Sequence, residues 1–169
     1  MFRGLTVLKR ITHGIPYESI VSEARKVGAN LIVMGSHGNE GSERYFIGSN
    51  IQKVMRETSL PVLLVKKKLT GRKWNRVVFA TSFDEDISRP FDRLKPLLKD
   101  MRATVYLLYV NTPSNFKDDR TVLEQMDHVI ERHKDIRFAT GIYNQYDLDA
   151  GILEYATLVK ADCIVMVTH

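Results

Sequence analysis

Residues 31–65 constrain the fold of this chain more than any other stretch. Residues 31–34 form a continuous apolar run, which is typical of a parallel strand buried on both faces. A glycine-rich segment follows, then apolar residues at helical spacing from residue 51, and then a second apolar run at 61–65. This order of strand, loop, helix and strand predicts a β-α-β unit of a parallel sheet.

The glycine-rich segment has the residue types of a phosphate-binding loop. Gly35 and Gly38 come at the end of the first strand, and Gly48 and Ser49 come directly before the helix. In a parallel unit this order places backbone N–H groups, a hydroxyl and the positive end of a helix dipole at the carboxyl end of the strand. The alternative is that the glycines only form turns and Ser49 caps the helix.

The spacing narrows the choice of phosphate motif. No Lys follows Gly48 and Ser49 as in a P-loop, and the segment lacks a compact G-x-G-x-x-G. Two residues between Gly35 and Gly38, and nine between Gly38 and Gly48, resemble the motif of the ATP-binding subgroup of the universal stress protein (UspA) family. The resemblance implies that ATP, with or without Mg²⁺, is held by Gly35, Ser36, His37, Gly38, Gly48, Ser49 and Asn50.

Other apolar patterns predict α/β structure along the rest of the chain. Residues 5–12 are expected to form a strand with Leu5, Val7 and Ile11 facing inward. Pro96 is expected to kink or divide one helix. The remaining helices are predicted at 16–27, 87–101, 122–134 and 148–160, and the remaining strands at 77–80, 104–110, 136–143 and 163–167.

An internal repeat relates the two ends of the chain. The sequence ANLIVMGSH at 29–37 aligns without gaps on ADCIVMVTH at 161–169, and the preceding helical residues agree as well. An offset of 132 residues is the size of a domain. The chain is therefore interpreted as two incomplete tandem copies, the first entering at its third strand and the second stopping at its fourth.

The resemblance to universal stress proteins covers nearly the whole chain. Residues 77–85 are similar to the family's opening strand and turn, and residues 61–65 to its last strand, while 110–116 resemble tandem members from bacteria. The resemblance implies Rossmann-like open parallel sheets with strand order 3-2-1-4-5, in a protein that is truncated at both ends. Residues 1–68 would be the C-terminal half of one domain, 69–73 a linker, and 74–169 the N-terminal part of a second domain.

Two departures from the family concern the nucleotide site. Ser82 stands where ATP-binding members usually have an Asp, and a hydroxyl is a weaker, uncharged partner for a nucleoside. Val167 replaces the glycine equivalent to Gly35 in the second copy. Neither copy alone is expected to hold a complete nucleotide site.

Charge and composition exclude several classes of protein. Residues 1–73 hold thirteen Lys/Arg and five Asp/Glu, a net charge of +8, which is compatible with an anionic ligand, whereas residues 74–169 carry −3. Aromatic residues do not alternate with basic ones, so nucleic acid binding is not expected. No apolar run is long enough to cross a bilayer and no signal peptide begins the chain, which predicts a cytoplasmic protein without membrane contact. The single Cys163 is interpreted as a core residue.

The chain offers no catalytic set. No nucleophile–His–acid arrangement, metal-ligand cluster or carboxylate pair can be assigned, and His37 and His169 are interpreted as loop-ordering residues. The resemblance therefore implies a stress-response protein that binds ATP or another adenine nucleotide and acts by signalling rather than turnover, with slow hydrolysis a weaker hypothesis. The alternative is a nucleotide-independent interaction module, because family members commonly dimerise through the last strand, here residues 61–65. Self-association that covers open strand edges is a related prediction.

Overall fold

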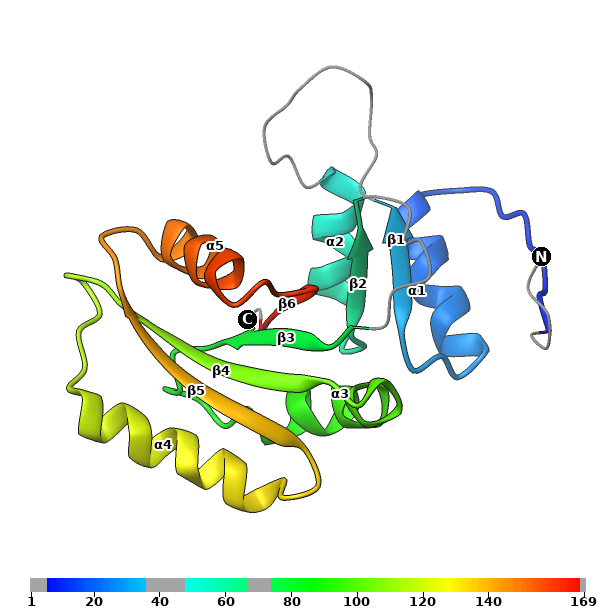
Figure 1. Ribbon diagram of the computed structural model, residues 1–169. Helices are drawn as coiled ribbons and strands as arrows, with labels where there is room; N and C mark the ends of the chain where they lie inside the picture. Colours follow the sequence, from blue (N-terminus) through cyan, green and yellow to red (C-terminus); the bar gives the residue numbers. More distant parts are fainter. Residues whose placement is uncertain (1–5, 36–47, 67–73, 168–169) are drawn as a thin grey trace. The chain divides into compact units, whose positions relative to one another are not determined.

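The computed structural model describes residues 6–35, 48–66 and 74–167. The chain divides into two compact units, Met1–Lys68 (unit 1) and Leu69–His169 (unit 2) (Figure 1). Both units have α/β structure with parallel strands, so the predicted fold class is confirmed. The part of the chain that the structure describes contains no helix long and apolar enough to span a membrane.

Unit 1 packs two helices against one face of a two-stranded parallel sheet. Its elements are α1 (Pro16–Lys26), β1 (Ile32–Gly35), α2 (Ser49–Glu57) and β2 (Val62–Val65). In the parallel register Ile32 lies opposite Val62 and Gly35 lies opposite Val65. Side chains alternate between the two faces of a strand. Ile32 of β1 forms a buried core with Val21 and Ala24 of α1 and Val54 of α2.

Unit 2 contains a four-stranded parallel sheet that is covered on both faces. Its elements are β3 (Arg76–Ala80), α3 (Ser88–Met101), β4 (Thr104–Asn111), α4 (Asp119–Arg132), β5 (Arg137–Asn144), α5 (Leu148–Leu158) and β6 (Cys163–Met166). The strand order is β5-β4-β3-β6, which is the 3-2-1-4 part of the predicted order. Figure 1 shows α5 on one face and α3 and α4 on the other.

The core of unit 2 follows this layering. Val78, Leu108 and Ile152 lie in the cluster beneath α5, and all are buried. On the other face the Phe91 ring lies 5.5 Å from that of Phe79. The two central strands, β3 and β4, are buried along most of their length, and their sequences are nearly continuous apolar runs, as expected for strands that are covered on both faces.

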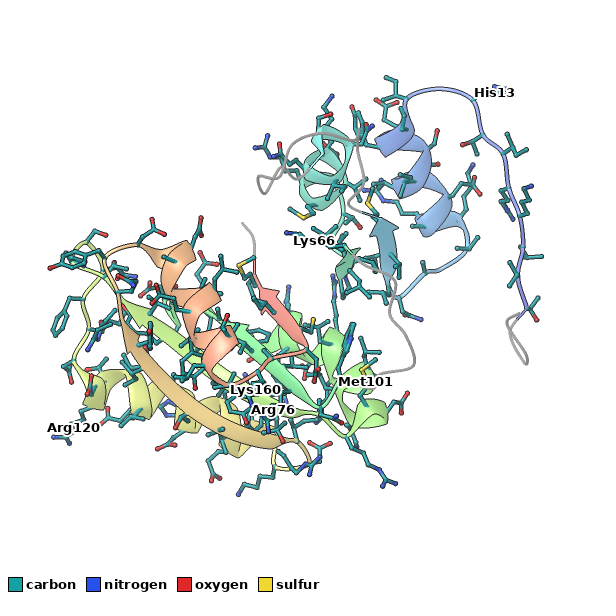
Figure 2. The ribbon with its side chains drawn as sticks, turned by 45° about the horizontal axis from the view of Figure 1, so that its top comes forward. His13, Lys66, Arg76, Met101, Arg120 and Lys160 are labelled. Atoms are coloured by element: carbon teal, nitrogen blue, oxygen red, sulfur yellow. The ribbon has the colours of Figure 1, made fainter. Side chains whose placement is uncertain are left out.

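The internal repeat has the same local structure in both units. The backbone N–H of Ala29 donates to the carbonyl of Ala24 at 2.9 Å, and that of Ala161 donates to the carbonyl of Ala156 at 2.8 Å. The residue before each donor is left-handed, with φ of 63° at Gly28 and 53° at Lys160. In Figure 2 Lys160 lies beside Arg76, at the amino edge of the unit 2 sheet. The same turn therefore ends α1 and α5 before each following strand.

The predicted strand at residues 5–12 is wrong for its described part. Residues 6–12 form no strand, and Val7 and Ile11 are 67% and 80% exposed rather than inward-facing. The strand that holds this place in unit 2 is β5, which is separated from β6 by β4 and β3. By the internal repeat β6 corresponds to β1, so the same order in unit 1 would separate residues 6–12 from β1 by two strands. The described part of unit 1 therefore contains no strand with which residues 6–12 could pair.

The predicted division of a helix at Pro96 is also absent, while the alternative, a kink at Pro96, stays a prediction. The helix α3 runs without interruption from Ser88 to Met101 with Pro96 inside it. Proline removes one helical hydrogen bond, the one to the carbonyl four residues earlier, which here belongs to Asp92. Asp92 is on the exposed side of the helix, where water can bond that carbonyl, and Phe91 and Leu98 on the buried side hold the helix against the sheet.

Candidate functional site

The carboxyl edge of the unit 1 sheet contains the described part of the predicted phosphate loop. Gly35 is the last residue of β1, and Ser49 is the first residue of α2. Figure 1 shows α2 beginning at the edge where β1 and β2 end. Gly48 and Asn50 flank Ser49 at this edge, while the predicted ligands Ser36, His37 and Gly38 lie outside the described residues.

The first turn of α2 presents backbone N–H groups. The carbonyl of Gly48 accepts hydrogen bonds from Ile51 at 2.9 Å and Gln52 at 3.2 Å, whereas the N–H groups of Ser49 and Asn50 have no acceptor among the described residues. The first turn contains no acidic residue that would compensate the helix dipole. Ser49 is the first helical residue rather than the N-cap, which is Gly48. The structure gives no support to a capping role for Ser49.

Gly35 and Gly48 differ from the glycines that serve the fold. A Cβ at Gly141 would lie 2.2 Å from the Tyr155 hydroxyl oxygen, and one at Gly151 would lie 2.6 Å from a Val110 methyl carbon. At Gly35 and Gly48 a Cβ would meet no described atom within 4 Å, and neither residue has the left-handed φ that favours glycine. Conformation and packing among the described residues therefore do not explain these two glycines. Close approach of a ligand to the backbone is one use of glycine that is compatible with both positions.

A shallow hollow of about 300 Å³ in unit 1 is a different place. It is lined by residues of α1, among them Tyr17 and Arg25, and by Glu57. Glu57 is the last residue of α2, so the hollow lies at the opposite end of that helix from Gly48. It does not coincide with the predicted phosphate site.

The corresponding edge of unit 2 is occupied by an ion pair. The Lys117 ammonium donates to the carbonyl of Ser82 at 2.7 Å and to Asp84 Oδ1 at 2.6 Å. It also lies 5.4 Å from the centre of the Tyr109 ring. The hydrogen bond from Lys117, together with one from Ser82, lowers the pKa of Asp84. Lys117 thus binds the segment in which Ser82 replaces the family's Asp.

The pair of Asp84 and Lys117 was missed by the sequence analysis. The two residues are 33 positions apart and neither belongs to a recognisable motif. They meet because β3 and β4 are neighbours in the sheet and both connections leave at its carboxyl edge. Only the parallel register could have indicated their contact.

The described residues provide little for reactive chemistry. No group of three or more His, Cys, Asp and Glu that could hold a metal is found in the described ranges. Burial raises the pKa of the Cys163 thiol to about 11, which keeps it protonated at neutral pH. His169 lies outside the described residues, so its role stays a prediction.

Comparison with known proteins identifies the family. The family model described as "Universal stress protein family" matches residues 2–66. Universal stress protein MJ0577 of Methanocaldococcus jannaschii is 40% identical over 65 residues, which are 38% of this chain and 40% of that protein. Residues 2–66 belong to the universal stress protein family. Universal stress protein MJ0531 of the same organism is 41% identical over 64 residues, 38% of each chain.

A solved structure extends the family's fold over both units. The crystal structure of a universal stress protein from Archaeoglobus fulgidus DSM 4304 has a TM-score of 0.70 and 22% sequence identity. It covers 95% of this chain, which matches 56% of that universal stress protein. The chain spans about 40% of the length of the two curated universal stress proteins. The tandem bacterial origin and the domain division at the predicted linker stay predictions.

Proposed function

We propose that unit 1 binds the phosphates of an adenine nucleotide, ATP first, at the start of α2. The observation that carries this proposal is that the N–H groups of Ser49 and Asn50 have no acceptor among the described residues, and that a Cβ at Gly35 or Gly48 would meet no described atom within 4 Å. Ser36, His37 and Gly38 would complete the phosphate contacts. A phosphate accepts N–H hydrogen bonds and is favoured by the positive end of the helix dipole.

The charge of the first part of the chain supports an anionic ligand. Residues 1–73 carry a net charge of +8, and α2 itself holds Lys53 and Arg56 but only one acid, Glu57, at its far end. The choice of adenine rests on the family resemblance of the glycine spacing. The same resemblance, with the absence of a catalytic set from the sequence, supports signalling rather than turnover, and Mg²⁺ would be carried by the nucleotide.

Calorimetric titration with Mg-ATP tests the proposal. We expect saturable binding to the wild-type chain and at least tenfold weaker binding to Gly48→Trp, because the indole fills the open space at the helix start. The matched control is Ser59→Trp, which adds the same side chain at an exposed position after the other end of α2. No wild-type binding, or equal loss in both variants, would contradict the proposed site.

Phosphate release separates binding from hydrolysis. A signalling protein leaves Mg-ATP intact at the concentration that saturates calorimetric binding. Phosphate release by the wild type above the level of Gly48→Trp would show turnover at this site. The same release by both chains would point to a contaminating activity.

A nucleotide-independent interaction module is the second candidate. Among the described strands β2 pairs with β1 alone, so its other edge carries unpaired backbone groups that a second copy could pair with. Light scattering should then show a dimer without nucleotide that dissociates on Leu64→Pro. The Pro61 carbonyl bonds β1, so in the alternating ladder the Leu64 N–H faces the open edge of β2, and proline removes that donor. Leu60→Pro, just before β2, is the control. A monomer at all concentrations would rule this candidate out.

A further inference from the structure

Three large apolar side chains are exposed at the carboxyl edge of the unit 2 sheet. Phe116 is 73% exposed, Tyr146 is 87% exposed and Leu148 is 53% exposed. Phe116 lies in the connection between β4 and α4, Tyr146 lies in the connection between β5 and α5, and Leu148 is the first residue of α5. We name these three residues the loop patch. Single exposed apolar residues are ordinary, but three on two adjacent connections form a surface that favours a partner.

Asn111 holds both connections in place. Its backbone carbonyl accepts a hydrogen bond from the N–H of Gln145 at 2.9 Å, and its side-chain oxygen accepts one from the N–H of Lys117 at 2.9 Å. Asn111 is only 4% exposed. Phe116 precedes Lys117 in the sequence, and Tyr146 follows Gln145. Each exposed side chain therefore lies next to a residue that is hydrogen-bonded to the buried Asn111.

A further bond fixes the connection that carries Phe116. The Tyr109 hydroxyl donates to the carbonyl of Asn115 at 2.8 Å, and Tyr109 is almost fully buried. The apolar side chains are thus presented on a supported frame. A preordered surface loses less conformational entropy when it binds, and exposed aromatic residues are the side chains that contribute most at interfaces.

The surroundings of the loop patch are acidic. The three connections at this edge, taken together with the first two residues of the helices that follow them, are residues 82–89, 112–120 and 145–149. They contain seven acidic and three basic residues, a net charge of −4. All seven acidic residues are exposed: Asp84, Glu85, Asp86, Asp118, Asp119, Asp147 and Asp149. Asp118 and Asp147 also cap the starts of α4 and α5, but capping leaves their charge in place. Figure 2 labels Arg120 at this edge, away from Arg76 and Lys160 at the amino edge.

This charge selects the kind of partner. A nucleotide polyphosphate is repelled by the acidic residues, and the Lys117 ammonium, which bonds the Ser82 carbonyl, is already paired with Asp84. A positively charged segment is attracted by the same field. We propose that the loop patch and its acidic surroundings dock a Lys/Arg-rich segment of a partner protein that also carries apolar side chains. The proposal does not depend on nucleotide binding by unit 1.

Fluorescence anisotropy with synthetic peptides tests this docking surface. The probe is a fluorescein-labelled peptide of Lys, Leu and Gly, and its counterpart has Glu at every Lys. We expect saturable binding of the Lys peptide that weakens with salt, and no binding of the Glu peptide. The double variant Phe116→Ser with Tyr146→Ser should weaken the binding at least tenfold. Leu158→Ser, which removes another exposed side chain at the end of α5, should leave it unchanged.

A second variant tests the charge without touching the loop patch. Asp119→Asn with Asp149→Asn should weaken the Lys peptide about threefold and reduce its salt dependence. If Phe116→Ser with Tyr146→Ser no longer unfolds cooperatively on heating, the charge variant tests the proposal in its place. Binding that is unaffected by both double variants, or lost equally in Leu158→Ser, overturns the proposal. So does binding of a fluorescent ATP analogue that the aromatic variant abolishes and Gly48→Trp retains, because the patch would then be a nucleotide surface.

Discussion

The carboxyl edges of the two units share a frame and differ in chemistry. In unit 1 the first turn of α2 has no acid, and a Cβ at Gly35 or Gly48 would meet no described atom within 4 Å. In unit 2 the same edge carries a net charge of −4, and Lys117 is bound to Ser82 and Asp84. Strand and helix positions are set by buried side chains, whereas connections are free to change. A repeated fold can therefore present one edge suited to anions and another suited to cations.

The largest expected effect comes from the glycines, which divide into two kinds. Gly151→Ala should destabilise unit 2 by about 1–3 kcal/mol, because its Cβ would overlap Val110. Gly35→Ala should change stability by less than about 0.5 kcal/mol. Urea unfolding followed by the fluorescence of Trp74, the single tryptophan, reports on unit 2, and circular dichroism reports on both units. A costly Gly35→Ala would show that this glycine serves the fold, and the comparison between the two kinds would fail.

Acid should destabilise unit 2 through His133. This side chain is 3% exposed, and its Nδ1 atom has no hydrogen-bond partner among the residues that the structure describes. Burial lowers the pKa of His133 below its usual 6.5, with Lys95 and Arg132 acting in the same direction and Asp92 and Asp135 opposing.

The sign follows from the lowered pKa. The unfolded chain takes up the proton first, so stability is full above about pH 6.5 and falls as the pH drops toward the folded-state pKa. Trp74-monitored urea unfolding at pH 7.5 and 5.5 should show this loss in the wild type and in His128→Gln, an exposed control. The loss should be smaller in His133→Gln. An identical pH dependence in all three chains would exclude His133.

A smaller effect is expected from the ion pair that distinguishes the unit 2 edge. Lys117→Met should cost about 0.5 kcal/mol at neutral pH, since Asp84 is more than half exposed and solvent screens the pair. In this variant the lowered pKa of Asp84 should return toward its ordinary value. In the wild type the lowered pKa contributes stability that is present above about pH 4 and lost in acid, and this contribution should be smaller in Lys117→Met. Carboxyl titration by NMR measures this pKa. Lys134→Met, which breaks an exposed pair with Glu131, is the control, and an equal pKa in all chains would contradict the contact.

The last prediction concerns the reactivity of a repeat position and not the stability of the fold. Leu31 in unit 1 corresponds to Cys163 in unit 2, and burial raises the pKa of that thiol to about 11. At pH 8 its alkylation by iodoacetamide should be about a hundredfold slower than in the urea-unfolded chain, because the thiolate fraction is that much smaller. Equal rates would show that Cys163 is a reactive thiol and not the packing equivalent of Leu31.

The errors of the sequence analysis share one cause. The run at residues 6–12 has strand-forming residues, but a strand also needs a neighbour, and the observed order places none beside it within the described part of unit 1. Pro96 is a helix breaker by propensity, yet Phe91 and Leu98 keep α3 continuous through their packing. In both places tertiary contacts override a local preference.

What the sequence determined by itself was periodicity and spacing. Apolar runs and helical repeats located nearly every strand and helix, and the glycine spacing with the repeat at 161–169 pointed to the family. Tertiary structure alone decided which glycines pack and which are open, and that Lys117 meets Asp84. It also placed the two connections that carry Phe116 and Tyr146 around Asn111. Periodicity is a local property that every segment carries, whereas these contacts join residues that only the register of the parallel strands brings together.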